Sequence, residues 1–192
     1  MADYIASELE IDEKNSWGTD PAIFAALNEE FNFSLDAAAS DKNHKCDYYY
    51  TANDDAIRIN WHRDITLNYG CDDVVPPNYN VWVNPPYGRG LIQKFMEKAV
   101  EQKALGVTTV MLVPATLDAQ WLPLHDIAEI RIVTGGRLSF MHPVNFKKIA
   151  GNTKGSMFVI FAPTKSPMIT RYVYRDELVE KGQQILKIKG VM

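Results

Sequence analysis

The sequence predicts one α/β domain with a mainly parallel sheet and helices on both of its faces. Apolar strand patterns alternate along the chain with amphipathic helix patterns. The segment Thr108 to Val113 is apolar almost throughout, as expected for a strand buried on both faces. The chain has 192 residues, enough for one domain of about 150 to 200 residues, and shows no internal repeat. We expect residues 1–16 to form a flexible leader and residues 17–192 a single compact domain with a C-terminal helix.

The first half of the chain begins with a clear helix start. Asp20 is suited to cap a helix whose first residue is Pro21, and apolar residues recur at helical spacing as far as Phe31. Phe33 to Asp36 reads as a short strand that runs into small residues. The following polar, tyrosine-rich stretch is predicted to be mostly loop, and Ile57 to Trp61 alternates like a strand.

The second half continues the alternation. Val81 to Val83 forms a short apolar strand, and the apolar residues from Leu91 to Val100 then repeat as in an amphipathic helix, with Gly106 closing it. After Thr108 to Val113, the patterns predict a helix at Trp121 to Asp126, strands at Ile130 to Thr134, Leu138 to Met141 and Met157 to Phe161, and a terminal helix at Glu177 to Lys187.

The tetrapeptide Asn84-Pro85-Pro86-Tyr87 directly follows the strand Val81 to Val83, at the sheet edge where open α/β folds bind ligands. Asn84 supplies an amide oxygen, and Pro85 holds its carbonyl in a set direction because its φ is fixed. Two acceptors therefore face one NH2 group. Tyr87 adds an aromatic face on which a flipped-out base can stack. This set of groups fits N-methylation of a planar amine or amide.

Charge is distributed unevenly along the chain. The net charge is −4, but residues 1–129 hold 9 basic and 21 acidic residues, whereas residues 130–175 hold 8 basic residues and no acidic one. Such a one-sign segment is typical of a surface that binds a polyanion. We expect phosphate contacts from residues in it, namely Arg137, Lys147, Lys148 and Lys154.

Other compositional features narrow the class of protein. No apolar run approaches about 18 residues and the N-terminus is acidic and polar, so we expect a cytoplasmic protein without a membrane span. Two cysteines argue against a disulfide framework, and the four histidines lack metal-site spacing with them, so we expect no metal.

Several segments together resemble the phage-type, Dam-like DNA N6-adenine methyltransferases, which use S-adenosylmethionine. The resemblance covers roughly residues 15–163 and is carried, in order, by Trp17 to Pro21, Phe33 to Ser40, Lys45-Cys46, Tyr49 to Thr51, Trp61, Val81 to Tyr87, Leu112 to Ala115, Trp121, Gly136 to Phe140 and Met157 to Phe161.

The resemblance implies a Rossmann-like methyltransferase fold, with S-adenosylmethionine bound at the carboxyl ends of the first strands. It implies that Trp17 and Thr19 close over the methionine end of the cofactor. Three further groups would contact the cofactor: Asp36 with Ala37 and Ala38, an acidic residue at Asp54 or Asp55, and Asn84. A helix or turn cap is the alternative role for Asp36, and the loop after it lacks a G-x-G pattern. A phage-encoded enzyme would act on double- or single-stranded DNA in the cytoplasm of its bacterial host.

Two other functions remain open from the sequence. The same tetrapeptide serves methylation of cytosine N4, of guanine N2 in RNA or of a protein glutamine, although the basic segment favours nucleic acid. The second is a catalytically inactive module that only binds nucleic acid. The intact Asn84 and Tyr87 disfavour this function. Neither the recognition sequence nor the oligomeric state follows from the residues, but the small size predicts relaxed sequence specificity.

Overall fold

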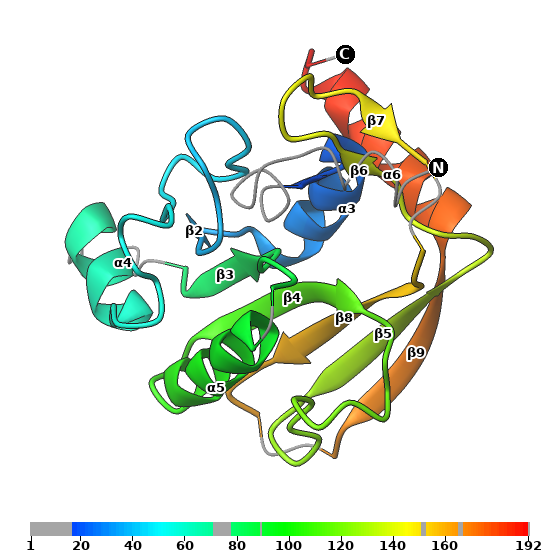
Figure 1. The fold of residues 1–192 in the computed structure, drawn as a ribbon. Coiled ribbons are helices and arrows are strands. Elements are labelled where there is room, and N and C mark those ends of the chain that lie inside the picture. Colours follow the sequence, from blue (N-terminus) through cyan, green and yellow to red (C-terminus); the bar gives the residue numbers. More distant parts are fainter. Residues whose placement is uncertain (1–16, 71–77, 89, 151–152, 165–166, 192) are drawn as a thin grey trace.

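The computed structural model of the chain describes residues 17–70, 78–88, 90–150, 153–164 and 167–191 (Figure 1). The expected leader at residues 1–16 lies outside this range. The helices are α3 (Pro21–Phe31), α4 (Trp61–Tyr69), α5 (Leu91–Lys103) and α6 (Arg175–Ile188). The strands are β1 (Gly18–Thr19), β2 (Leu35–Asp36), β3 (Asn80–Val83), β4 (Thr108–Pro114), β5 (Glu129–Thr134), β6 (Phe140–Met141), β7 (Lys148–Ile149), β8 (Ser156–Phe161) and β9 (Ile169–Tyr174).

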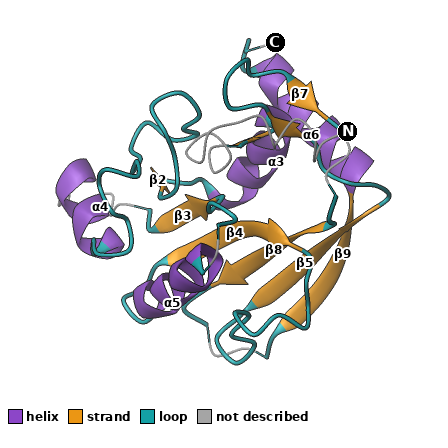
Figure 2. Cartoon of the chain, viewed as in Figure 1, coloured by secondary structure: helices purple, strands orange, loops and turns teal. Residues whose placement is uncertain are grey.

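Six strands form the main sheet in the order β2-β3-β4-β8-β5-β9 (Figure 2). The pairs β2–β3, β3–β4 and β5–β9 are parallel, and β8 runs antiparallel between β4 and β5. The predicted mainly parallel α/β sheet is therefore confirmed. A second sheet is small and antiparallel, with the order β1-β6-β7.

The two faces of the main sheet bury separate apolar clusters. On one face, Phe95 and Met96 of α5 pack with Val81 and Val83 of β3. On the other face, Leu27 of α3 packs with strand residues that include Trp82 and Leu112, and α6 packs against the same cluster. Because side chains alternate along a strand, neighbouring residues of β3 serve opposite faces. Helices therefore cover both faces, as the apolar strands predicted.

Helix α6 approaches α3 very closely at one point. Gly182 is buried there, and a Cβ atom placed on it would lie 1.8 Å from the Ala22 carbonyl oxygen. Only a residue without a side chain fits this crossing, so Gly182 fixes how the C-terminal helix packs.

Two predicted elements are wrong. Ile57 to Trp61 is not a strand: residues 56–58 form a turn, and α4 begins at Trp61 with the Asn60 side chain accepting a hydrogen bond from Arg63 N at 2.9 Å. The helix expected at Trp121 to Asp126 is a series of turns. A polar helix cap set the backbone in the first segment and a proline did so in the second. The spacing of apolar residues therefore predicted the wrong element in both. The sequence patterns also missed β9, which follows what they gave as the last strand.

Among the residues that the structure describes, no helix is both long and apolar enough to cross a membrane.

Candidate active site

The tetrapeptide Asn84-Pro85-Pro86-Tyr87 begins where β3 ends. The parallel register pairs Leu35 of β2 with Val81 and Asp36 with Trp82, so the carboxyl ends of β2 and β3 lie side by side. The loop that follows β2 and the tetrapeptide therefore meet at one edge of the sheet, as the sequence predicted. This edge is the usual place for a ligand in an open α/β fold.

The Asn84 side chain is oriented by a contact with the segment before β1. Its Nδ2 donates a hydrogen bond to the Trp17 carbonyl oxygen at 2.9 Å, across 67 positions of sequence. Since the NH2 group is engaged, Oδ1 is the atom that remains to accept a hydrogen bond. No partner for Oδ1 is found among the described residues. The structure thus brings Trp17 and Asn84 together and leaves one amide acceptor for a substrate.

The rest of the tetrapeptide combines a buried backbone with a partly exposed ring. Pro85 is buried, and within the described parts of the chain its carbonyl accepts no hydrogen bond. Tyr87 is 42% exposed, yet its hydroxyl points inward and lies 3.4 Å from the Leu112 carbonyl oxygen at the end of β4. Burial of the phenol group raises the pKa of Tyr87. The hydroxyl end is therefore anchored while part of the ring remains accessible.

Asp36 ends β2 and is only 3% exposed. Its carboxylate accepts hydrogen bonds from Ala38 N at 3.3 Å and from Lys45 N at 3.0 Å. Burial disfavours the charged form and raises the pKa of Asp36 to about 6, although these two bonds act in the opposite direction. The carboxylate therefore organises the loop between residues 37 and 45, which is the turn-capping role that the sequence left open beside a cofactor contact.

The small-residue run after Asp36 has its backbone donors occupied. Ala37 N donates to the Trp82 carbonyl and Ala39 N to the Tyr50 carbonyl, while Ser40 N donates to Asn43 Oδ1. With Ala38 N held by Asp36, this loop offers a ligand a close van der Waals surface and no free N–H group. A ligand approaching it would gain packing, for which small side chains suffice.

Thr19 is an unsatisfied polar group beside this edge. It belongs to β1, directly after Trp17 and Gly18, and is 3% exposed. Its Oγ1 is buried with no hydrogen-bond partner in the described part of the chain. A buried hydroxyl without a partner is uncommon and costs free energy. A ligand with a polar or charged end would satisfy it, so the residues at this edge fit a small amphipathic cofactor.

The two acidic residues expected to contact the cofactor, Asp54 and Asp55, have partners within their own turn. Asp54 is exposed and accepts hydrogen bonds from Thr51 N at 2.7 Å and Thr51 Oγ1 at 2.8 Å, which lower its pKa. Asp55 pairs with Arg58 at 3.1 Å. Both carboxylates shape their own turn, and within the described part of the chain neither forms a hydrogen bond or ion pair with Asp36 or Asn84.

A different acidic residue is tied to the site, and sequence reasoning missed it. Asp64 of α4 receives the hydroxyl groups of Tyr48 at 3.4 Å and Tyr50 at 3.2 Å. Tyr50 N in turn donates to the Asp36 carbonyl at 2.9 Å. The alternation of Tyr48 and Tyr50 in the sequence indicated that these two side chains point the same way. Because a strand was predicted at Ile57 to Trp61, the helix that begins at Trp61 and carries Asp64 was not recognised.

The basic segment at residues 130–175 is not one uniform patch. Acidic residues from elsewhere in the chain neutralise several of its members: Arg131 pairs with Glu30 and Glu129, Arg171 with Glu129, Arg175 with Asp176 and Lys148 with Asp20. Lys147 and Lys154 are exposed and form no ion pair with any described residue. Arg137 is exposed as well, and Lys165 lies outside the described residues. Three of these pairs, Arg131–Glu30, Arg171–Glu129 and Lys148–Asp20, join residues far apart in the sequence, so the sequence pattern alone did not show them.

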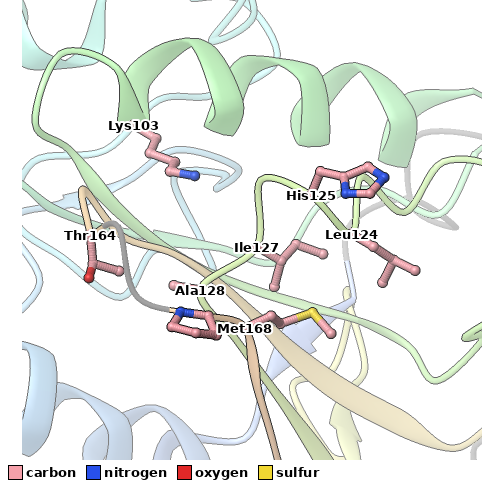
Figure 3. Close-up of a pocket in the computed structure, with 8 residues that line it drawn as sticks. Lys103, Leu124, His125, Ile127, Ala128, Thr164 and Met168 are labelled. Carbon is pink, nitrogen blue, oxygen red and sulfur yellow. The ribbon is translucent and has the colours of Figure 1, made fainter.

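A cavity of about 340 Å³ lies at the opposite edge of the sheet (Figure 3). Its lining includes Lys103 at the end of α5 and Ala128 just before β5, which places it at the amino ends of the parallel strands. Lys103 Nζ donates to the Asp126 carbonyl at 2.6 Å. This cavity is therefore separate from the edge that carries Asn84.

Comparison with known proteins agrees with the chemistry of this edge. A family model described as DNA N-6-adenine-methyltransferase (Dam) matches residues 6–185, a wider span than the sequence motifs covered. A DNA N-6-adenine-methyltransferase of Escherichia phage T1 is 27% identical in an alignment 178 positions long, which covers 84% of this chain and 68% of that protein. A DNA N-6-adenine-methyltransferase of Haemophilus phage HP1 (strain HP1c1) is 27% identical in an alignment 178 positions long, which covers 88% of this chain and 92% of that protein. The chain belongs to the DNA N-6-adenine-methyltransferase (Dam) family.

Proposed function

We propose that this protein transfers a methyl group from S-adenosylmethionine to N6 of an adenine that has rotated out of DNA. Methylation of adenine N6 in DNA is the activity of the family to which the chain belongs. The single observation that carries the residue assignment is the Asn84–Trp17 hydrogen bond, since it leaves the amide oxygen of Asn84 as an acceptor at the carboxyl edge of the sheet. The related phage proteins bear the same activity in their names.

The main sheet supports a Rossmann-like methyltransferase fold. Three parallel strands, β2, β3 and β4, carry the loop after Asp36 and the tetrapeptide, and antiparallel β8 separates β4 from β5. The crossover between β2 and β3 is reduced to one short helix, α4. The fold would thus keep the parallel strands that position the reacting groups and shorten the connection between β2 and β3.

The residues at this edge would hold the cofactor by different means. Thr19 Oγ1 would gain the hydrogen-bond partner it lacks from the methionine end of the cofactor, and Trp17 would cover that end. Ala37 and Ala38 would pack against the ligand, while the buried carboxylate of Asp36 holds their loop in place. Bound S-adenosylmethionine supplies an electrophilic methyl group on a positively charged sulfur.

Asn84 and Pro85 would activate the amine. The lone pair of adenine N6 is delocalised into its ring, so N6 is a weak nucleophile. The Asn84 Oδ1 and the Pro85 carbonyl would accept its two hydrogens and favour a pyramidal nitrogen. As N6 forms its bond to the methyl carbon and the bond from that carbon to sulfur breaks, positive charge grows on nitrogen, and these oxygens stabilise it. The alkylated nitrogen then loses one proton to solvent, so no strong base is needed.

Tyr87 would hold the rotated base. The accessible part of its ring offers a stacking surface, and the contact between its hydroxyl and the Leu112 carbonyl anchors the far end of the ring. Stacking offsets part of the cost of removing a base from the duplex, which is a few kcal/mol.

Nucleoside analysis tests the function directly. DNA is incubated with the protein and S-adenosylmethionine, digested and examined by mass spectrometry. We expect N6-methyladenine as the product. Finding only N4-methylcytosine would overturn the adenine assignment, and finding no modified base in DNA or RNA would overturn the nucleic-acid substrate.

A further inference from the structure

The turn between β6 and β7 presents two apolar side chains to solvent. This turn comprises the six residues from His142 to Lys147, and in it Val144 is 54% and Phe146 41% exposed. Phe146 has a φ of 55°, in the left-handed region that a bulky residue rarely adopts. Such strain costs on the order of 1–3 kcal/mol and is found mostly at functional sites. The chain thus retains an exposed aromatic residue in an unfavourable backbone conformation.

The turn has a fixed shape because His142 holds it together. His142 is buried, and its Nδ1 accepts hydrogen bonds from Val144 N at 3.2 Å and Asn145 N at 3.4 Å. Phe146 N donates to the His142 carbonyl at 3.0 Å, and His142 N donates to the Lys147 carbonyl at 2.9 Å. The backbone that carries Phe146 is therefore held in one conformation before any partner binds.

The same histidine connects the turn to the reacting group. The His142 ring lies edge-to-face against Trp17, with 5.3 Å between ring centroids. The Trp17 carbonyl accepts the hydrogen bond from Asn84. Pairing of β1 with β6 adds a second connection, with Thr19 opposite Phe140. The turn, drawn in yellow in Figure 1, is thus coupled to Asn84 through one side-chain contact and one strand pair.

The surroundings of the turn suit a polyanion. Lys147 directly follows Phe146, is exposed and forms no ion pair with any described residue. An apolar tip beside a lysine matches the two surfaces of a duplex, namely stacked bases and phosphates. Proteins that deform DNA commonly insert an apolar side chain between base steps.

Resting on the proposed function, we propose that Phe146, flanked by Val144, enters the base stack of duplex DNA next to the position that the target adenine vacates. A rotated base leaves a gap whose walls are the faces of the neighbouring bases. An aromatic side chain fills this gap and slows the return of the adenine. Phe146 is then a substrate-contacting residue that matters only when the adenine starts out paired.

The test compares two substrates with the variant Phe146→Ala. One duplex carries a paired target adenine, and in the other the same adenine faces an abasic site, so that it is already unpaired. We expect the variant to methylate the paired target at least about tenfold more slowly, in line with the few kcal/mol of unstacking, and the unpaired target within about twofold of wild type. An equal loss on both substrates, or no loss on the paired one, would overturn the proposal.

Phe146→Gly separates this role from a structural one. Glycine tolerates a positive φ, so this variant relieves the strain, and its melting temperature should be equal to or higher than that of wild type. Its methylation rate on the paired target should nevertheless fall as much as that of Phe146→Ala. Phe146→Trp, which keeps an aromatic ring, should retain most of the wild-type rate. If Phe146 instead formed a contact between protein copies, the Phe146→Ala and Phe146→Gly variants would both have a lower sedimentation coefficient than wild type. Their methylation rates would then fall equally on both substrates, which would also contradict the proposal. If wild type methylated neither substrate, the proposed function itself would be wrong.

Discussion

At the scale of single residues, the site depends on groups whose roles are set by what they contact. The Asn84 amide has one half engaged by Trp17 and the other half available. Asp36 has both carboxylate oxygens engaged by backbone donors and is buried. The first arrangement suits a residue that contacts the substrate, whereas the second suits a residue that holds a loop.

Asn84→Ala should lower the methylation rate by on the order of a hundredfold or more, because it removes a preorganised acceptor. Binding of S-adenosylmethionine should survive, since Thr19 and the loop after Asp36 remain. Single-turnover rates and calorimetric titration with the cofactor measure the two effects separately. Loss of cofactor binding together with activity would show that Asn84 chiefly supports the fold of the site through Trp17.

Tyr87→Phe and Tyr87→Ala distinguish stacking from hydrogen bonding. The phenylalanine variant loses only the 3.4 Å contact with the Leu112 carbonyl and should be mildly affected. The alanine variant loses the ring, and base stacking is worth about 1–3 kcal/mol, which corresponds to roughly a 5- to 150-fold loss in rate. Steady-state kinetics on one duplex compares them. Equal damage from both changes would refute stacking as the main role of Tyr87.

Asp36 should make stability depend on pH in an unusual direction. Its pKa rises from 3.8 to about 6 on folding, so the folded protein binds this proton more tightly than the unfolded chain does. The contribution of Asp36 to the free energy of unfolding is therefore greatest below pH 4 and falls as pH rises through 6. Relative to Asp36→Asn, which does not ionise, wild type should lose about 2–3 kcal/mol over this window. Urea unfolding of both proteins at several pH values measures this difference, and a wild type that gained stability relative to Asp36→Asn as pH rose would contradict the prediction.

At the scale of elements, the small sheet β1-β6-β7 brings distant segments to the edge of the main sheet that carries Asn84. β1 carries Thr19 and follows Trp17, while β6 and β7 carry the turn with Phe146. Lys148 of β7 also forms an ion pair with the buried Asp20, which caps α3. Lys148 therefore has an acidic partner, whereas its neighbour Lys147 forms no ion pair with any described residue.

Lys147 and Lys148 should differ in their effect on DNA binding. Lys147→Ala should reduce the slope of log affinity against log salt concentration by about one, because an unpaired lysine displaces a counterion from a phosphate. Lys148→Ala should change this slope less, since Lys148 is already paired with Asp20. Fluorescence anisotropy with one duplex at several salt concentrations gives both slopes. If the Lys147 variant bound more weakly with an unchanged slope, the phosphate contact would be excluded.

At the scale of the whole molecule, the family match takes up nearly all of the chain. It spans residues 6–185 and therefore includes β9 and most of α6, which the sequence motifs left out. A separate domain for reading DNA sequence does not fit within the described chain. The turn between β6 and β7, which carries Phe146, is the segment beside the site that we expect to contact bases of the duplex.

Sequence specificity should accordingly be low. Reading base edges in the major groove requires a helix, a ribbon or a long loop that presents several side chains. We expect a context of at most one to three bases around the methylated adenine. Sequencing of methylated positions in mixed-sequence DNA at limiting enzyme measures this context. Methylation confined to a motif of four or more fixed bases would show that the small turn, or a second copy of the chain, reads more than this.

The sequence by itself determined the features that depend on neighbouring residues. The apolar runs of β3 and β4, the capping of α3 by Asp20 and the position of the tetrapeptide after a strand follow from local pattern. The terminal helix was also predicted, because its apolar spacing continues over several turns. These features need no knowledge of what packs against them.

Only the tertiary structure decided which distant groups meet. The Asn84–Trp17 bond spans 67 positions, and the ion pair of Arg131 with Glu30 spans 101. The same holds for the burial of Asp36, the orphaned hydroxyl of Thr19 and the positive φ of Phe146. Each of these depends on how strands are ordered and how turns are closed. Such contacts are set by the packing of the whole chain, which a local pattern of apolar and polar residues does not encode.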